Sequence, residues 1–202
     1  MSKTRTRLAA GALALAASLL LTACGTPPWQ QAGVAGRATP TPTSTDKITT
    51  VVNELAAGST KHQLTAGNIA LDVTYFSTLN MGDWTADADK PVSISMTAKL
   101  TGDEGQAVYL SRLGLSVAVY GPDGALTAPA PLADTATVSP GYLVKSPYSY
   151  SQAFILPRLD AAATYVTLSL TYELLLQTTP TSAEYAKQTA TDTLTVAIAP
   201  KR

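Results

Sequence analysis

An acidic loop holds the residues whose types and spacing best suit a chemical role. Between residues 80 and 89 the chain carries three carboxylates, those of Asp83, Asp87 and Asp89. Oxygen ligands clustered in a loop are what Ca²⁺ requires, so the loop predicts a Ca²⁺ site. The spacing does not follow the EF-hand pattern. A solvated acidic loop between two strands is the simpler interpretation, because connecting segments are polar by default.

Aromatic side chains suggest a second kind of site. Trp84 lies inside the acidic loop, and Tyr142, Tyr148 and Tyr150 follow later in the chain. Exposed tryptophan and tyrosine side chains stack on sugars or anchor protein partners. Tyr148 and Tyr150, however, share the alternation of Phe154, which is the pattern of a core face. This leaves Trp84 as the candidate ligand-binding residue.

The sequence contains no recognisable catalytic set. A Ser-His-Asp arrangement needs a histidine held in a pocket, whereas the only histidine, His62, precedes the first clear strand. The G-x-S-x-G elbow and the phosphate-binding loop are both missing. A zinc site needs several His or Cys ligands, and the chain has one of each. We therefore predict that the protein is not an enzyme and needs no cofactor other than the hypothetical Ca²⁺.

The only cysteine, Cys24, follows a short apolar segment near the start of the chain. Three basic residues, Lys3, Arg5 and Arg7, precede the apolar run at residues 8–21. This is the layout of a secretory signal, and the run is shorter than the roughly 20 residues of a membrane-spanning helix. With one cysteine in 202 residues, no intrachain disulfide can form.

The residues Leu21-Thr22-Ala23-Cys24 resemble the lipobox of bacterial lipoproteins. The resemblance implies cleavage before Cys24, a diacylglyceryl group on its thiol, and a fatty acid such as palmitate on the freed amino group. Two or more acyl chains are needed for stable anchoring, since each buried CH₂ contributes about 0.8 kcal/mol. We expect a protein lipid-anchored to the cell membrane and facing outside the cytoplasm, with the bilayer as a partner. A secreted protein with an unrelated cysteine is the alternative.

Composition divides the chain into three parts. Residues 1–23 are the predicted lipoprotein signal peptide, and residues 24–61 are the lipidated cysteine with a flexible tether. The Pro/Thr tract at residues 38–45 favours an extended, solvated chain. Residues 62–202 are the predicted folded domain.

One segment of the tether has helical spacing. Apolar residues recur from Ile48 to Leu55, between a capping Asp46 and Gly58. So short a helix is marginal in water, and the sequence leaves open whether it forms.

From residue 62 onward the apolar residues recur with a period of two. The six clearest segments are residues 69–75, 92–98, 113–119, 148–156, 166–174 and 194–198, with further strands indicated at Tyr109 and residues 142–144. Alternation gives each strand one apolar and one polar face. Antiparallel sheets with one solvated face have this pattern, and two such sheets packed face to face form a β-sandwich.

The number and spacing of these strands resemble an immunoglobulin-like sandwich, without the paired cysteines and core tryptophan of antibody domains. Acidic and basic residues are equal in number, 14 each, and no basic cluster suggests binding to nucleic acid. We expect a binding or scaffold domain of the cell envelope, with an envelope protein or glycan as partner. A carbohydrate- or small-ligand-binding module is the first alternative, and an envelope hydrolase is the disfavoured second.

Overall fold

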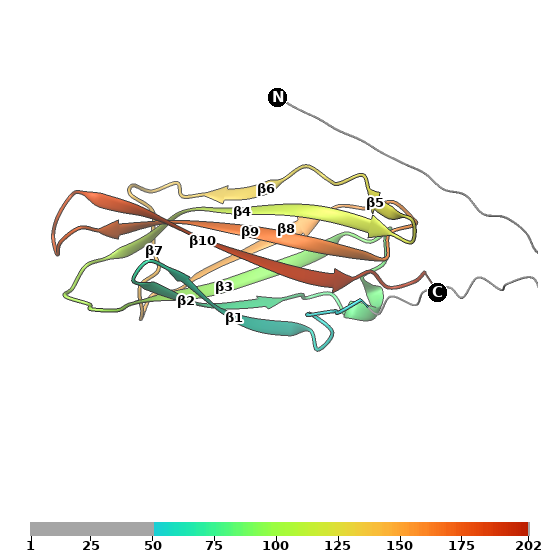
Figure 1. The fold of residues 1–202 in the computed structure, drawn as a ribbon, viewed down its shortest axis with the longest axis horizontal. Coiled ribbons are helices and arrows are strands. Elements are labelled where there is room, and N and C mark those ends of the chain that lie inside the picture. Colours follow the sequence, from blue (N-terminus) through green and yellow to red (C-terminus); the bar gives the residue numbers. More distant parts are fainter. Residues whose placement is uncertain (1–50, 202) are drawn as a thin grey trace, which may run out of the picture. The chain divides into compact units, whose positions relative to one another are not determined.

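The structure is a computed structural model that describes residues 51–201. The lipobox, Cys24 and the tether up to residue 50 lie outside the described residues. The described part consists of two antiparallel sheets that pack against each other (Figure 1). The predicted all-β sandwich is therefore confirmed.

The two sheets differ in how their strands are arranged. The first sheet has the strand order β1-β2-β3-β8. Its strands are β1 (Ser59–Ala66), β2 (Ile69–Phe76), β3 (Lys90–Leu100) and β8 (Tyr150–Leu156). The second sheet is built on three long strands in the order β10-β9-β4, and three short strands pair with the other edge of β4. These strands are β4 (Val108–Gly121), β5 (Gly124–Leu126), β6 (Leu132–Thr135), β7 (Tyr142–Leu143), β9 (Tyr165–Gln177) and β10 (Tyr185–Ala197).

The alternation in the sequence explains the core. In the second sheet Leu115 of β4 lies opposite Leu170 of β9, and Val117 lies opposite Leu168. All four side chains are buried. The first sheet contributes the alternate residues of its two central strands, namely Ile69, Leu71, Val73, Tyr75, Val92, Ile94, Met96 and Ala98. Burial of this apolar surface between the sheets is the main favourable term in folding.

The packed chain begins earlier than residue 62, where we expected the domain to start. β1 starts at Ser59, and Leu55 is fully buried in the core. We missed β1 because Leu64 is the only large aliphatic residue in it. Residues 54–57 form a turn instead of a helix, and the turn ends at Gly58, whose φ of 84° favours glycine. Residues 46–50, the first part of the segment with helical spacing, lie outside the described residues.

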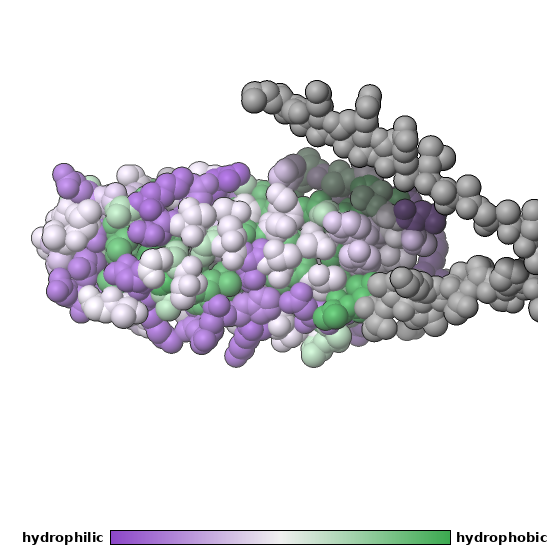
Figure 2. Space-filling model, viewed as in Figure 1, coloured by the Kyte–Doolittle hydropathy of each residue, from purple (hydrophilic) through white to green (hydrophobic). Residues whose placement is uncertain are grey.

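One face of the sandwich is largely polar (Figure 2). The face seen in Figure 2 carries mostly hydrophilic and neutral side chains, with apolar ones scattered among them. Residues 51–201 contain no helix that is long and apolar enough to span a membrane.

Candidate functional site

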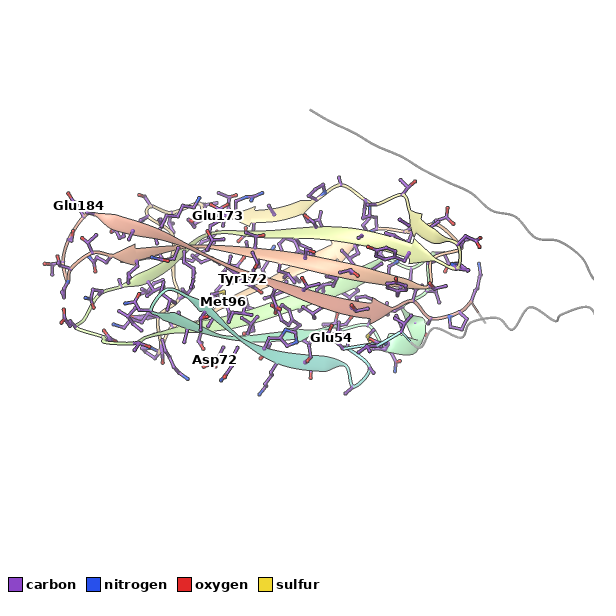
Figure 3. All side chains as sticks on the ribbon, viewed as in Figure 1. Glu54, Asp72, Met96, Tyr172, Glu173 and Glu184 are labelled. Carbon is purple, nitrogen blue, oxygen red and sulfur yellow. The ribbon has the colours of Figure 1, made fainter. Side chains whose placement is uncertain are left out.

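Five polar side chains meet where β1 and β10 contact each other across one side of the sandwich. They are Glu54 before β1, His62 in β1, Tyr75 in β2, Tyr172 in β9 and Asp192 in β10. We call this set the polar cluster. Tyr75 and Tyr172 are fully buried, whereas the side chain of Glu54 is 26% exposed. Figure 3 labels Glu54 and Tyr172, the most exposed member and one of the two buried members.

Asp192 is the shared acceptor of the cluster. Its Oδ2 accepts a 2.6 Å hydrogen bond from the Tyr75 hydroxyl and lies 2.7 Å from Nδ1 of His62. The hydroxyl oxygens of Tyr75 and Tyr172 are 2.8 Å apart. Because Tyr75 donates its only hydroxyl hydrogen to Asp192, Tyr172 is the donor to Tyr75. Burial is the largest cause that raises the pKa of both tyrosines, so both hydroxyls remain donors at neutral pH.

Glu54 extends the cluster to the start of the folded chain. Its Oε1 accepts a 2.7 Å hydrogen bond from the backbone N–H of Thr195, and its own N–H donates to the Thr195 carbonyl at 3.0 Å. Its Oε2 lies 3.3 Å from Nε2 of His62. Both ring nitrogens of His62 therefore face carboxylates, and only the imidazolium form donates from both.

These contacts suit a structural role better than catalysis. Both nitrogens of His62 are engaged, so neither is available to take a proton from a substrate. The contacts join the turn before β1 and two strands of the first sheet to two strands of the second. We missed the cluster from sequence because His62 precedes the first strand that we identified, and the sequence offers no signal that pairs it with Asp192.

We expect the Asp192→Ala variant to lose about 2 kcal/mol of unfolding free energy, because His62 and Tyr75 lose their shared acceptor. Urea unfolding of the full chain measures this loss. Asp72→Ala is the matched control, since Asp72 bonds Lys99 on the exposed outer face and such surface pairs contribute at most about 1 kcal/mol. Equal losses in the two variants would contradict a role of the polar cluster in holding the two sheets together.

A polar groove of about 420 Å³ crosses the first sheet. The strand register places two rows of side chains across β1, β2 and β3. One row is Lys61, Thr74 and Ser95, and the other is Gln63, Asp72 and Thr97. Asp72, labelled in Figure 3, accepts hydrogen bonds from Lys99 at 2.7 Å and Gln63 at 3.1 Å. The Lys99 bond is the largest cause that lowers the Asp72 pKa. Hydroxyl, amide and carboxylate groups are among those that line the groove.

The structure separates the three carboxylates of the acidic loop. Asp83 ends the short 3₁₀ helix η2 (Met81–Asp83). Asp87 accepts a 2.6 Å hydrogen bond from Thr85 and pairs with Lys201 at 2.9 Å. The Thr85 bond is the largest cause that lowers the Asp87 pKa to about 2. Within residues 51–201 no three His, Cys, Asp or Glu side chains are placed to hold a metal ion, and Ca²⁺ binding at Asp83, Asp87 and Asp89 stays a prediction.

The backbone carbonyls of the acidic loop surround the ammonium group of a lysine, Lys90. Lys90 is fully buried, and its Nζ donates to the backbone carbonyls of Thr85 at 3.1 Å, Ala86 at 3.4 Å and Ala88 at 2.5 Å. Burial lowers the Lys90 pKa, while the charges of nearby Asp89 and Asp87 oppose that shift. The sequence held a signal for this residue. Lys90 is an even-numbered residue of β3, as are the core residues of that strand, so its side chain points inward.

Trp84 is not a surface residue, which corrects our expectation of a ligand-binding side chain. It is fully buried, and its Nε1 donates a 2.9 Å hydrogen bond to the Ser77 hydroxyl. A ligand has no access to its ring. The hydroxyl of Ser77 also donates to the Pro91 carbonyl at 2.8 Å, so Trp84 joins the acidic loop to the beginning of β3.

The two tyrosines that we expected to share a core face differ in exposure. Tyr150 is 7% exposed, as expected, whereas Tyr148 is 57% exposed because it precedes β8 and does not continue its alternation. The Tyr150 hydroxyl donates to Asp134 at 2.6 Å, and its ring stacks on Tyr142 with centroids 5.6 Å apart. Tyr148 is therefore the exposed member of the aromatic set.

Comparison with protein-family models finds no match for this chain, and comparison with curated proteins finds no significant match.

Proposed function

We propose that the protein is a lipid-anchored lipoprotein of the cell envelope, whose β-sandwich acts outside the cytoplasm as a binding or scaffold domain. The observation that carries the proposal is the sequence Leu21-Thr22-Ala23-Cys24 after a basic and apolar leader. Within residues 51–201, Leu55 is the first fully buried residue of the sandwich, which is compatible with a tether before it. About 30 residues separate this point from Cys24 and give the domain reach from the membrane.

We also propose that the sandwich is immunoglobulin-like. In that fold one sheet contains the strands A, B, E and D, and the other contains C, F and G; within residues 51–201 no strand fills the D position beside β8. The order β2-β3-β8 corresponds to A-B-E, and β4-β9-β10 corresponds to C-F-G. β1 is then an additional strand beside A.

A ligand-binding role is the second candidate, and the polar groove across β1, β2 and β3 favours it. Ligand sites are concave and about 300–1,000 Å³ in volume, with a few polar groups that fix the ligand's orientation, and the volume of this groove lies in that range. The ligand would be hydroxylated, such as an envelope glycan, and Trp84 would take no part because it is buried.

Replacing Cys24 with serine tests the anchoring proposal. We expect the Cys24→Ser protein, made in a bacterial host with the lipoprotein-processing enzymes, to leave the detergent phase, to incorporate no labelled palmitate and to keep its signal sequence. Membrane fractionation and intact mass measure all three effects. Ser44→Ala in the Pro/Thr tract is the control and should behave as the parent protein. If the Cys24→Ser protein had the parent's mass and partitioning, the anchoring proposal would be refuted.

A further inference from the structure

β8 has a free edge in the described part of the chain. On one side of the sandwich β1 and β10 contact each other, and in the second sheet the outer edge of β4 is covered by β5, β6 and β7. β8 pairs only with β3. Its other edge therefore has unpaired backbone groups of the kind with which an added strand forms hydrogen bonds.

Two contacts show which backbone groups of β8 face outward. The Pro91 carbonyl accepts a hydrogen bond from Ser77, which follows β2. The backbone carbonyl of Pro91 in β3 therefore points toward β2. Ala98 exchanges hydrogen bonds with Val144 and Ser146 on the opposite side of β3. Because backbone groups alternate along a strand, even-numbered residues of β3 bond β8. Their partners on β8 are Tyr150, Gln152 and Phe154. The N–H and C=O groups of Ser151, Ala153 and Ile155 therefore point to the free edge.

The side chains along this edge leave it unprotected. Natural edge strands are usually shielded by charged residues, proline or bulges, but residues 150–156 contain no charge and no proline. Ile155 is 53% exposed on the strand, and Tyr148 is 57% exposed just before it. They are two of the four large apolar side chains exposed within residues 51–201. Apolar exposure is thus concentrated at the strand whose backbone is unpaired.

We propose that this edge pairs antiparallel with the same edge of a second copy of the chain, with Ala153 facing the partner's Ala153 on a two-fold axis. The outward residues 151, 153 and 155 are symmetric about Ala153, so Ser151 lies opposite the partner's Ile155. Each opposed pair exchanges two hydrogen bonds, which gives about six across the axis. The result is a continuous sheet through both copies.

The charges along the edge favour a second copy as the occupant. β8 bears no charge, so two identical strands approach without repulsion. Beyond the strand the same symmetry brings the exposed ring of Tyr148 toward the partner's Arg158, and a guanidinium group over a tyrosine ring is attractive. The short strand makes a small interface, so the dimer is concentration-dependent. The pairing uses no lipid and stands or falls independently of the anchoring proposal.

Cysteine cross-linking tests the register. In a full-length Cys24→Ala background, purified in detergent, Ala153→Cys supplies a single thiol on the two-fold axis. Opposed Cα atoms in a hydrogen-bonded pair are about 5.5 Å apart, within disulfide range, so we expect a covalent dimer on mild oxidation. Ser151→Cys is the matched control, since its two copies lie about 13 Å apart along the strands. Adding Ile155→Cys to Ser151→Cys should restore the cross-link. Equal cross-linking from Ser151→Cys alone, or none from Ala153→Cys, would overturn the proposal.

Charge variants test the same axis without covalent chemistry. Ala153→Lys and Ala153→Glu should each sediment as monomers at concentrations where the parent protein dimerises, whereas their equimolar mixture should sediment at the dimer mass. The melting temperature of each variant shows whether it is folded, and folding is expected because the Ala153 side chain points to the outer face. Self-pairing at this edge would be refuted if the parent protein stayed monomeric at high concentration or bound another protein through β8 instead. It would also be refuted if neither charge variant changed dimerisation.

Discussion

Replacing Trp84 with alanine is expected to lower the free energy of unfolding by about 3–5 kcal/mol, the usual loss for a buried tryptophan. Its side chain is fully buried, and its Nε1 hydrogen bond to Ser77 holds the acidic loop on the beginning of β3. Urea unfolding of the full chain measures the loss. Trp84→Phe retains much of the ring but not the donor and should lose less.

Ser77→Ala separates the hydrogen bond from the packing. This variant removes the acceptor for Trp84 together with the Ser77 bonds to Pro91 and Leu79, and leaves the tryptophan ring in place. It should cost about 2 kcal/mol, less than Trp84→Ala. If Trp84 were a surface platform for a ligand, its substitution would change stability by only about 0.5 kcal/mol. A Trp84→Ala protein as stable as the parent would therefore contradict the buried position and revive a ligand-binding role.

Replacing Lys90 with alanine is expected to cost about 3 kcal/mol, because the buried stem leaves a cavity and the Ala88 carbonyl loses its donor. Lys90→Met restores the stem without the ammonium group. We expect it to recover part of the loss and to leave a deficit of about 1 kcal/mol. Thermal and urea unfolding of the two variants separate packing from the charge–carbonyl contacts.

Lys99→Met is the control for the lysine experiment. Lys99 lies on the same strand, but its side chain is 66% exposed and only pairs with Asp72, so its loss should have little effect. A Lys90→Met protein more stable than the parent would show that burying the ammonium group is a net cost. The acidic loop would then fold around Lys90 without being stabilised by it.

Alternation predicted the sandwich because a strand between a core and water must bury every second residue. Each of the six segments that we identified from sequence overlaps a strand of the structure. The prediction failed where the residues on the inner face of a strand are not all apolar. β1 places His62 on the inner face and uses Leu64 as its only large aliphatic residue, so it has no clear pattern. The prediction for Tyr148 was wrong for the opposite reason. In the sequence the alternation of β8 extends back to Tyr148, although the strand begins only at Tyr150.

The candidate sites show a sharper limit of sequence reasoning. Acidic residues close together in sequence suggested Ca²⁺, but Asp87 pairs with Thr85 and Lys201, and Lys90 supplies the charge that the loop carbonyls bind. The parity of Lys90 with the core residues of β3 was readable from sequence. The polar cluster was not, because Glu54 and Asp192 meet only once the two sheets pack. Lipidation at Cys24 and Ca²⁺ binding stay predictions.

The contact between Glu54 and Thr195 would be the first to bear load under the proposed anchoring, because Glu54 precedes every strand. In an anchored protein, tension along the tether reaches Glu54 before any strand. Two hydrogen bonds pass that load to β10, which is paired along its whole length with β9. β1 cannot peel from β2 until this contact breaks, and His62 then holds β1 to Asp192 as a second barrier. If the proposed anchor at Cys24 holds, the contact between Glu54 and Thr195 would therefore carry tension from the membrane before any strand does.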